Sequence, residues 1–374
     1  MEGRRRTEQK KSMTEYRFCK DLFQLQGSHV IDPRGDFPWP VIAAEKLPES
    51  VAQGFAEPVD FPPIAQAVLA EDRIAIAVEL DTPCGLEVAR LVAAQFVAQG
   101  IARENIQIVC ADQEGDAGDD FVVHDPSDSE QQAYLLVDRE GVACYVNRLL
   151  FEADVVVPIG TGDGGRIRNS LCAGFCDQET KKYLDRMKPE HASAMERMYD
   201  DNLGVFWQVR TVTAPGDEIL QVLVGASEAV LEKAGQIGTE AWALKIGSSA
   251  DLVVASVESS CCQTWSHLRQ AILNAAKVAN EDAIIVLCTE LRGKPSANWP
   301  MVDADHQDMD EDLADVFRGH HVYLASRLTQ DSTEKFGFGY VDKSSQIQKL
   351  IDQKESCLLL RDAHRVGLKQ LEAC

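Results

Sequence analysis

The residues with the most obvious chemical potential lie in one glycine-rich stretch, Val155–Cys176, with the sequence VVVPIGTGDGGRIRNSLCAGFC. It begins as an apolar strand and continues into a loop with five glycines, the usual place in an α/β protein for a phosphate or a reactive group. The stretch has no His and no Lys, so the side chains that commonly transfer protons or carry cofactors are missing. Arg166, Arg168 and two cysteines are its distinctive side chains.

The cysteines form a second group that could do chemistry. The chain has 11 of them and no C-x-x-C pair; the closest spacings are Cys172-x-x-x-Cys176 and the adjacent pair Cys261–Cys262. Thiols at the tip of a strand can bind a soft metal or a nucleotide ring, whereas cysteines buried in a core act as small apolar residues. Both interpretations stay open. An odd count without the form of a small secreted domain indicates reduced thiols in a cytoplasm.

The charge of the chain restricts its partners. With 37 Lys and Arg against 60 Asp and Glu, the net charge is −23, which disfavours nucleic acids and anionic membrane surfaces. The acidic runs Asp112–Asp120 and Asp303–Asp315 are typical of solvated loops or helix faces, with metal binding as the alternative. No apolar run approaches the ~20 residues of a membrane span, and no apolar signal segment follows the basic N-terminus. We therefore expect a cytoplasmic protein with a small-molecule ligand.

Alternating strands and helices must position these residues. The run Arg73–Leu80 is a continuous apolar strand, Gly85–Gly100 has helical spacing with a glycine stop, and Asn105–Ala111 is the next strand. This β-α-β unit implies parallel strands with a right-handed crossover. Further strands and helices follow in order; we expect strands at 133–137, 142–147, 153–160, 205–214 and 218–225, and helices at 179–199 and 227–236.

The pattern then starts again after the small, flexible sequence GQIGTEAW. Strands are expected at 251–257, 283–289, 321–326 and 356–360, and helices at 263–280, 311–318 and 344–354. The sequence thus predicts an α/β protein of two domains with mainly parallel sheets and an interdomain cleft as the default binding site. We assign residues 1–12 to a disordered basic tail, with Met13 as an alternative start, residues 13–236 to the first domain and 237–374 to a smaller second one.

Several local patterns, taken in order, resemble one family. They are RIAIAVELDTP, VVHDPSD, GVACYVNRLLFEADVVVPIG, CAGFC, VFWQVRTVTAPGDEILQVLVGASEAVLEKA, and a second-domain segment from ADLVVASV to IIVLCTELRG. Together they are similar to the nickel-pincer lactate racemase family over most of the chain after Phe61. The resemblance implies two α/β domains, an organonickel nucleotide cofactor in the cleft, and racemisation or epimerisation of a small 2-hydroxy acid by hydride transfer, an isomerase reaction.

Several catalytic motifs of that family are altered here. A strand-end motif S-D-x-T-R-P corresponds to ELDTPCG, in which Asp81 and Thr82 remain and the arginine is absent. Asp81 can cap the following helix or act at the site, and Thr82 can contact the cofactor. The catalytic histidine of G-T-H-R has no counterpart; Asp112 or Glu114 stands near its place. The pair His124–Asp125 matches a family H-D, and His124 is either a core histidine or a catalytic one.

The remaining candidates follow from the opening stretch. The strand-end Gly160 and the A-G-F turn match the family loop, the cofactor lysine falls at Thr180, and Lys181 restores a lysine one position later. One position rotates a helical side chain by ~100°, so a surface role for Lys181 stays open. The resemblance implies His191 as the nickel ligand, and Arg166 and Arg168 remain to bind the substrate carboxylate or a phosphate.

Two functions follow from this resemblance. The chain is a diverged nickel-dependent racemase or epimerase, or it is a racemase-fold protein that has lost that chemistry and binds a small anionic ligand or a partner. The missing arginine, the missing histidines and the rebuilt cofactor loop favour the second function, because losing a set of catalytic groups leaves little rate.

Overall fold

A computed structural model of the 374-residue chain describes most of its length. The described residues are 13–18, 21–26, 30–31, 39–79, 82–111, 120–162, 171–184, 187, 189–214, 218–246, 248–257, 263, 265–292 and 311–370. The chain divides into two compact units. The larger unit comprises Pro38–Trp242 and Ser259–Cys262, and the smaller unit comprises Met1–Phe37, Ala243–Glu258 and Gln263–Cys374.

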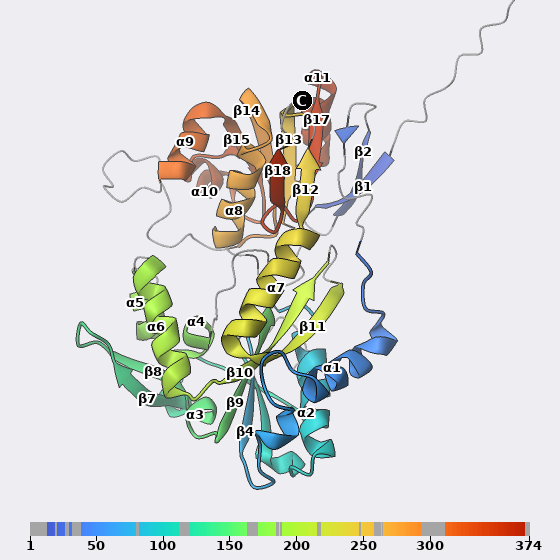
Figure 1. Ribbon diagram of the computed structural model, residues 1–374. Helices are drawn as coiled ribbons and strands as arrows, with labels where there is room; N and C mark the ends of the chain where they lie inside the picture. Colours follow the sequence, from blue (N-terminus) through green and yellow to red (C-terminus); the bar gives the residue numbers. More distant parts are fainter. Residues whose placement is uncertain are drawn as a thin grey trace, which may run out of the picture. The chain divides into compact units, whose positions relative to one another are not determined.

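A mostly parallel sheet forms the centre of the larger unit (Figure 1). Its strands lie in the order β11-β10-β9-β4-β5-β6, and only β11 runs antiparallel to its neighbour. Their bounds are β4 Ile74–Val78, β5 Ile106–Cys110, β6 Val122–Val123, β9 Val155–Thr161, β10 Trp207–Thr213 and β11 Ile219–Ala226. Every residue of β4 and β10 is buried, so both faces of the sheet are covered and the continuous apolar runs of the sequence are explained.

Two apolar layers cover this sheet. One contains α1 (Leu47–Ala56) and α2 (Gly85–Ala98) packed on side chains such as Ile76 and Val157. The other is formed by α3 Arg148–Phe151, α4 Leu171–Phe175, α6 Pro189–Asn202 and the hairpin of β7 Gln132–Val137 with β8 Ala143–Asn147. The helix α7 (Ser227–Ala241) packs on β10 and β11 through Val230 and Ala234. Short 3-10 turns occupy Ala44–Lys46, Ile64–Gln66, Arg103–Asn105 and Ser129–Gln131.

The smaller unit has its own sheet, which is entirely parallel. The strand order is β16-β15-β14-β13-β17-β3. The strands are β3 Val30–Ile31, β13 Ala250–Ser256, β14 Ala279–Cys288, β15 His321–Ala325, β16 Gly339–Tyr340 and β17 Cys357–Leu360, and the helices are α8 Trp265–Ala276, α9 Glu311–Gly319, α10 Gln330–Lys335 and α11 Ser344–Gln353. Two strand pairs complete the unit: β1 Met13–Phe18 with β2 Asp21–Gln26, and β12 Ala243–Ile246 with β18 Gly367–Gln370.

The α/β class with mainly parallel sheets is confirmed, and three local expectations change. The sequence GQIGTEAW is helical through Ala241, so the boundary drawn after residue 236 falls inside α7. The helix expected at 179–199 is two helices, α5 (Gln178–Leu184) and α6, and Pro189 begins the second because proline fits the first turn. Near the N-terminus, Val30–Ile31, which was expected in the first domain, pairs with β17 of the smaller unit. Among the described helices, none is long and apolar enough to cross a membrane.

Candidate functional site

The larger sheet has a topological switch point between β4 and β9. From β4 the chain builds outward through β5 and β6, and from β9 it builds the other way through β10 and β11. Open α/β sheets place their ligands at the carboxyl edge beside such a switch point, which here is the edge at which β4 and β9 end. Thr82 and Gly160, two residues selected from the sequence, lie at this edge, and the loop with Arg166 and Arg168 follows β9 in the sequence.

A buried ion pair lies across the switch point. The Arg210 guanidinium on β10 contacts both carboxylate oxygens of Glu79, which follows β4; Nη2 to Oε1 is 2.8 Å. The Gln208 Oε1 accepts from Arg210 Nε at 3.0 Å and from Nη2 at 2.6 Å. The Arg210 side chain is 0% exposed and that of Glu79 is 3% exposed. Because its hydrogen bonds are internal, this arginine links β10 to the end of β4 across the intervening β9 and is not presented to a substrate.

Gly160 makes this pair geometrically feasible. It lies on β9 between the two charged partners, opposite Arg210 in the β9–β10 register. A Cβ atom added to Gly160 would fall 1.6 Å from Arg210 Nη1 and 2.0 Å from Glu79 Oε2. The structure thus gives this glycine a packing reason that applies with or without a bound cofactor.

Thr82 closes the turn that leads from β4 into α2. Its Oγ1 donates to the Glu79 carbonyl at 2.9 Å, and its own carbonyl accepts from Gly85 N at 3.0 Å. The residue is 8% exposed. The hydroxyl proton is committed to this turn, so Thr82 can offer a ligand only its oxygen lone pairs.

His124 is buried in the core of the larger unit. The amide Nδ2 of Asn147 lies 3.0 Å from its Nδ1, and its Nε2 lies 3.0 Å from the Cys176 carbonyl. The amide can only donate, so Nδ1 accepts and the proton sits on Nε2, which donates to the carbonyl. Burial holds the pKa of His124 below its ordinary value, and the Cys176 carbonyl opposes that shift. Both ring nitrogens are used, which favours the core interpretation over the catalytic one.

The lysine and the histidine that the resemblance implies for the cofactor and its nickel both lie on the surface. On α5 the position of the family lysine is Thr180, which is 1% exposed, while the neighbouring Lys181 is exposed. His191 on α6 is also exposed. No three His, Cys, Asp or Glu side chains within the described part of the chain come together to hold a metal. These residues do not fit the pincer nucleotide and its nickel.

The described cysteines near the loop are buried thiols. Cys172 and Cys176 of the AGF turn are each 1% exposed and free of disulfides. Burial, followed by the neighbouring Cys176, raises the pKa of Cys172, and burial raises that of Cys144 to about 11. A thiol held neutral in this way is a poor metal ligand and a poor nucleophile, so these cysteines serve as small apolar residues.

Other residues selected from the sequence lie outside the described residues, as do most of the two acidic runs. They are Asp81, Asp112, Glu114, Arg166, Arg168, Cys261 and Cys262, together with the tail 1–12. The sequence did not reveal Glu79 and Arg210. The signal that could have found them is a charged residue inside an otherwise buried apolar strand, as in VFWQVRTV.

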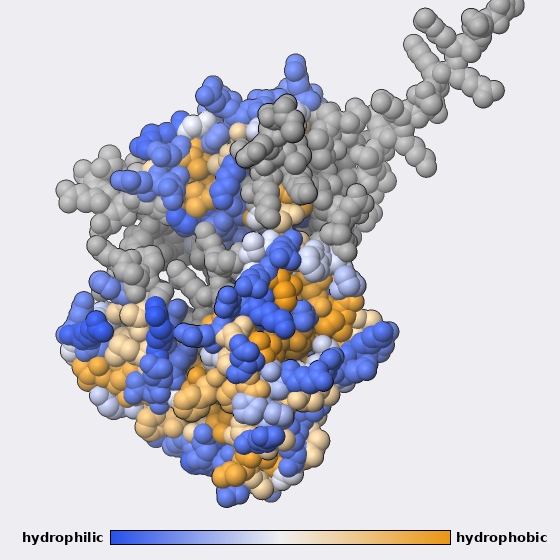
Figure 2. Space-filling view, in the orientation of Figure 1, coloured by the Kyte–Doolittle hydropathy of each residue, from blue (hydrophilic) through white to orange (hydrophobic). Residues whose placement is uncertain are grey.

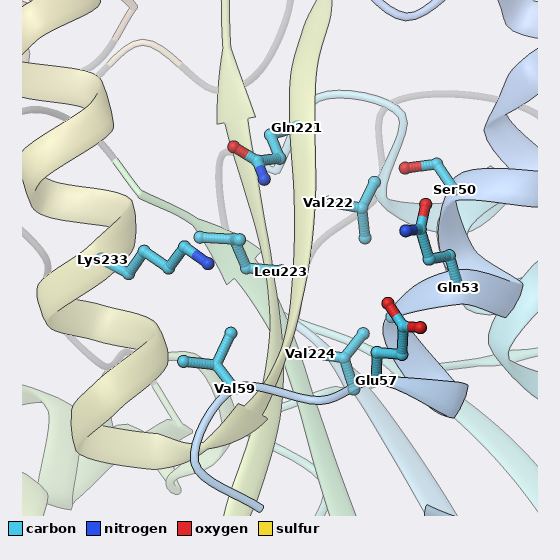
Figure 3. A pocket seen from close by; sticks show the side chains of 10 residues that line it. Ser50, Gln53, Glu57, Val59, Gln221, Val222, Leu223, Val224 and Lys233 are labelled. Carbon is cyan, nitrogen blue, oxygen red and sulfur yellow. The ribbon is translucent and has the colours of Figure 1, made fainter. Parts of the chain in front are cut away.

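A surface groove of about 230 Å³ lies elsewhere on the larger unit, along the outer strand β11 (Figure 3). Ser50 and Gln53 of α1, with Glu57 just after that helix, line one side and Lys233 of α7 the other, with apolar β11 side chains between them. Figure 2 shows this apolar strip between hydrophilic helix faces. Since β10 and β9 separate β11 from the switch point, the groove is distinct from the carboxyl edge between β4 and β9.

Comparison with protein-family models and with curated proteins finds no match. Solved structures do match. The lactate racemase apoprotein of Thermoanaerobacterium thermosaccharolyticum aligns with a TM-score of 0.66 over 96% of this chain and 100% of that one, at 13% identity. A structural genomics protein of Thermotoga maritima aligns with a TM-score of 0.62 over 88% and 99%, at 14% identity. The chain therefore has a lactate racemase-like two-domain α/β fold.

Proposed function

We propose that this chain is a lactate racemase-like protein that has lost nickel-pincer hydride transfer and binds a small anionic ligand at the switch point of its larger unit. The observation that carries the proposed loss of nickel-pincer chemistry is the orientation of α5, which buries Thr180 and exposes Lys181. An exposed lysine has no enclosed site in which to carry a nucleotide, and a threonine cannot form the lysine linkage that the resemblance implies.

The engagement of His124 supports the same conclusion. An acid–base histidine must exchange a proton with the substrate, whereas both nitrogens of His124 already bond to Asn147 and Cys176. Recruiting it would break two buried hydrogen bonds and expose the core. Within the described chain, the histidine that the family motif supplies therefore stabilises the fold.

The ligand class follows from the position of the arginines in the sequence. Arg166 and Arg168 come directly after β9, the strand that borders the switch point, and Arg210 is already neutralised by Glu79. Guanidinium groups prefer carboxylates and phosphates. A small 2-hydroxy acid or a related carboxylate is the ligand that this arrangement favours.

Loading the protein with cofactor tests the loss of chemistry. The chain and the Thermoanaerobacterium lactate racemase are each produced in cells that make the pincer nucleotide, and nickel content, intact mass and lactate racemisation are measured. We expect nickel and a covalent adduct in the racemase alone. An adduct on this chain that Lys181→Ala removes, together with racemisation, would refute the proposal.

Calorimetric titration with a panel of 2-hydroxy acids tests the ligand. We expect binding that weakens about tenfold in Arg166→Gln or Arg168→Gln, since each charge-assisted hydrogen bond contributes on this order. Arg73→Gln, which alters an exposed arginine paired with Asp154, is the matched control and should bind like the parent protein. Equal affinity in all variants would contradict a site at these arginines.

A further inference from the structure

The smaller unit has a switch point of its own, between β13 and β17. The chain runs from β13 through β14, β15 and β16 on one side, whereas β17 lies on the other side of β13. The turn after β17, Arg361–Arg365, therefore lies at the carboxyl edge where an open parallel sheet places a ligand.

This turn is held rigidly by its neighbours. Ala363 N donates to the Ser256 carbonyl of β13 at 2.8 Å. From α8, Asn274 Nδ2 donates to the carbonyls of Ala363 and Val366 at 2.8 and 2.9 Å. Asp362 takes a φ of 47°, a left-handed conformation that is uncommon outside glycine. A turn held at its middle and just beyond its end presents its side chains in a defined direction.

His364 is the side chain in this turn that lacks an explanation. The residue is 8% exposed, and its Nδ1 is buried without a hydrogen-bond partner in the described part of the chain. Its ring centroid lies 4.9 Å from that of His267 on α8. Burial, then the charge of Arg365, then His267, hold the pKa of His364 well below its ordinary value. Buried polar atoms almost always have a partner, so one that lacks it calls for a ligand or a reason.

The charges around His364 select the ligand class. Arg365 is 6% exposed and close enough to act on the ring electrostatically. The turn also carries Arg361 and one acid, Asp362, so its two arginines and one acid give it one net positive charge. A neutral imidazole donates one hydrogen bond and a guanidinium donates several in a fork, a combination that suits an oxyanion and disfavours a metal cation.

We propose that His364, His267 and Arg365 form an oxyanion-binding site at the β13–β17 edge of the smaller unit, for the phosphate or carboxylate group of a small ligand. The residues of this site all belong to the smaller unit, and the proposal does not depend on which reaction, if any, the larger unit performs.

Titration of the full-length protein with inorganic phosphate, and separately with acetate, tests the site. Calorimetry gives the affinity, and the histidine ring signals in the proton NMR spectrum report contact. We expect saturable binding of one of the two anions that weakens at least about tenfold in His364→Gln and Arg365→Gln. Binding of phosphate alone would assign a phosphoryl ligand, and binding of acetate alone a carboxylate.

His320→Gln is the matched control, because His320 also lies in the smaller unit and also has a buried Nδ1 without a hydrogen-bond partner among the described residues. It should bind like the parent protein. If the His364→Gln variant fails to fold, the anion affinity of the His267→Gln variant tests the site in its place. Unchanged affinity in the folded site variants, or no binding of either anion at about 10 mM, would overturn the proposal. So would saturable Ni²⁺ binding that replaces anion binding.

Discussion

The Arg210 guanidinium and the Glu79 carboxylate meet across Gly160, 131 residues apart in the sequence and almost completely shielded from water. This pair links β10 to the end of β4 across β9, at the edge of the larger unit where its ligand is proposed to bind. Removing either charge should lower the free energy of unfolding, which can be measured without an assay of function.

Breaking the pair by a single substitution should cost about 3–5 kcal/mol in the free energy of unfolding, because the remaining charge stays buried without its partner. Glu79→Gln and Arg210→Met are the two variants, compared by urea unfolding. The double variant Glu79→Leu/Arg210→Met should lose less than the sum of the single losses. Arg73→Met, which breaks the exposed pair with Asp154, is the control and should unfold like the parent. A loss in Arg210→Met no larger than in that control would contradict the assignment.

Gly160→Ala should destabilise the larger unit by about 3 kcal/mol, since the added methyl group overlaps Arg210 Nη1 and both must shift in a packed interior. Gly319→Ala is the matched control, because no atom lies within 4 Å of its added Cβ and alanine favours the end of α9. Thermal unfolding followed by circular dichroism separates the two. An unchanged melting temperature in Gly160→Ala would show that Arg210 and Glu79 pack less tightly around Gly160 than described.

Stability should fall as the pH drops through the range in which free histidine takes up a proton. Burial holds the pKa of His124 below its ordinary value in the folded protein, so the unfolded chain protonates first. The contribution of neutral His124 to the free energy of unfolding is complete above about pH 6.5 and is lost progressively below it. His124→Gln should therefore reduce the dependence of the urea midpoint on pH between about 7.5 and 5.5. A His124→Gln variant whose urea midpoint depends on pH as strongly as that of the parent protein would contradict the effect.

The cysteines should differ strongly in reactivity. Cys84 is exposed at the start of α2, whereas Cys172 and Cys110 are buried, and burial raises the pKa of Cys110 to about 12. Alkylation by iodoacetamide in the native state, followed by peptide mass spectrometry, should label Cys84 on the order of 100-fold faster than Cys172. Denaturant should remove the difference. Comparable native rates would mean that the core around α4 opens readily.

The sequence predicted the longer strands of both sheets within a few residues, because buried parallel strands are continuous apolar runs, but it did not reveal the two-residue strands β3, β6 and β16. The strand expected at Arg73–Leu80 is β4, and that expected at 356–360 is β17. The single helix at 179–199 was wrong, because its periodicity continues through a proline that begins a new helix. The boundary after residue 236 failed for a related reason: small residues in GQIGTEAW pack against a sheet as well as they form a hinge.

The site was harder to predict than the elements. The contact of Arg210 with Glu79 depends on β9 lying between β4 and β10, and no local pattern specifies strand order. His124 carried two interpretations because the same side chain serves as a base or as a core hydrogen-bonding group. Its partners, Asn147 and Cys176, come from distant segments, so only the folded chain could decide.

Thr180 has a consequence for any attempt to place a lysine at this position. It is the buried residue of α5, 1% exposed, with its backbone N 3.2 Å from Asp177 Oδ1 and its hydroxyl oxygen 3.4 Å from Tyr145 N. A lysine here would place an ammonium group in the interior, where burying an unpaired charge is costly. Several neighbouring side chains would have to change together before the lysine became tolerable. This face of α5 therefore accepts a cation only if the packing around it is rebuilt at the same time.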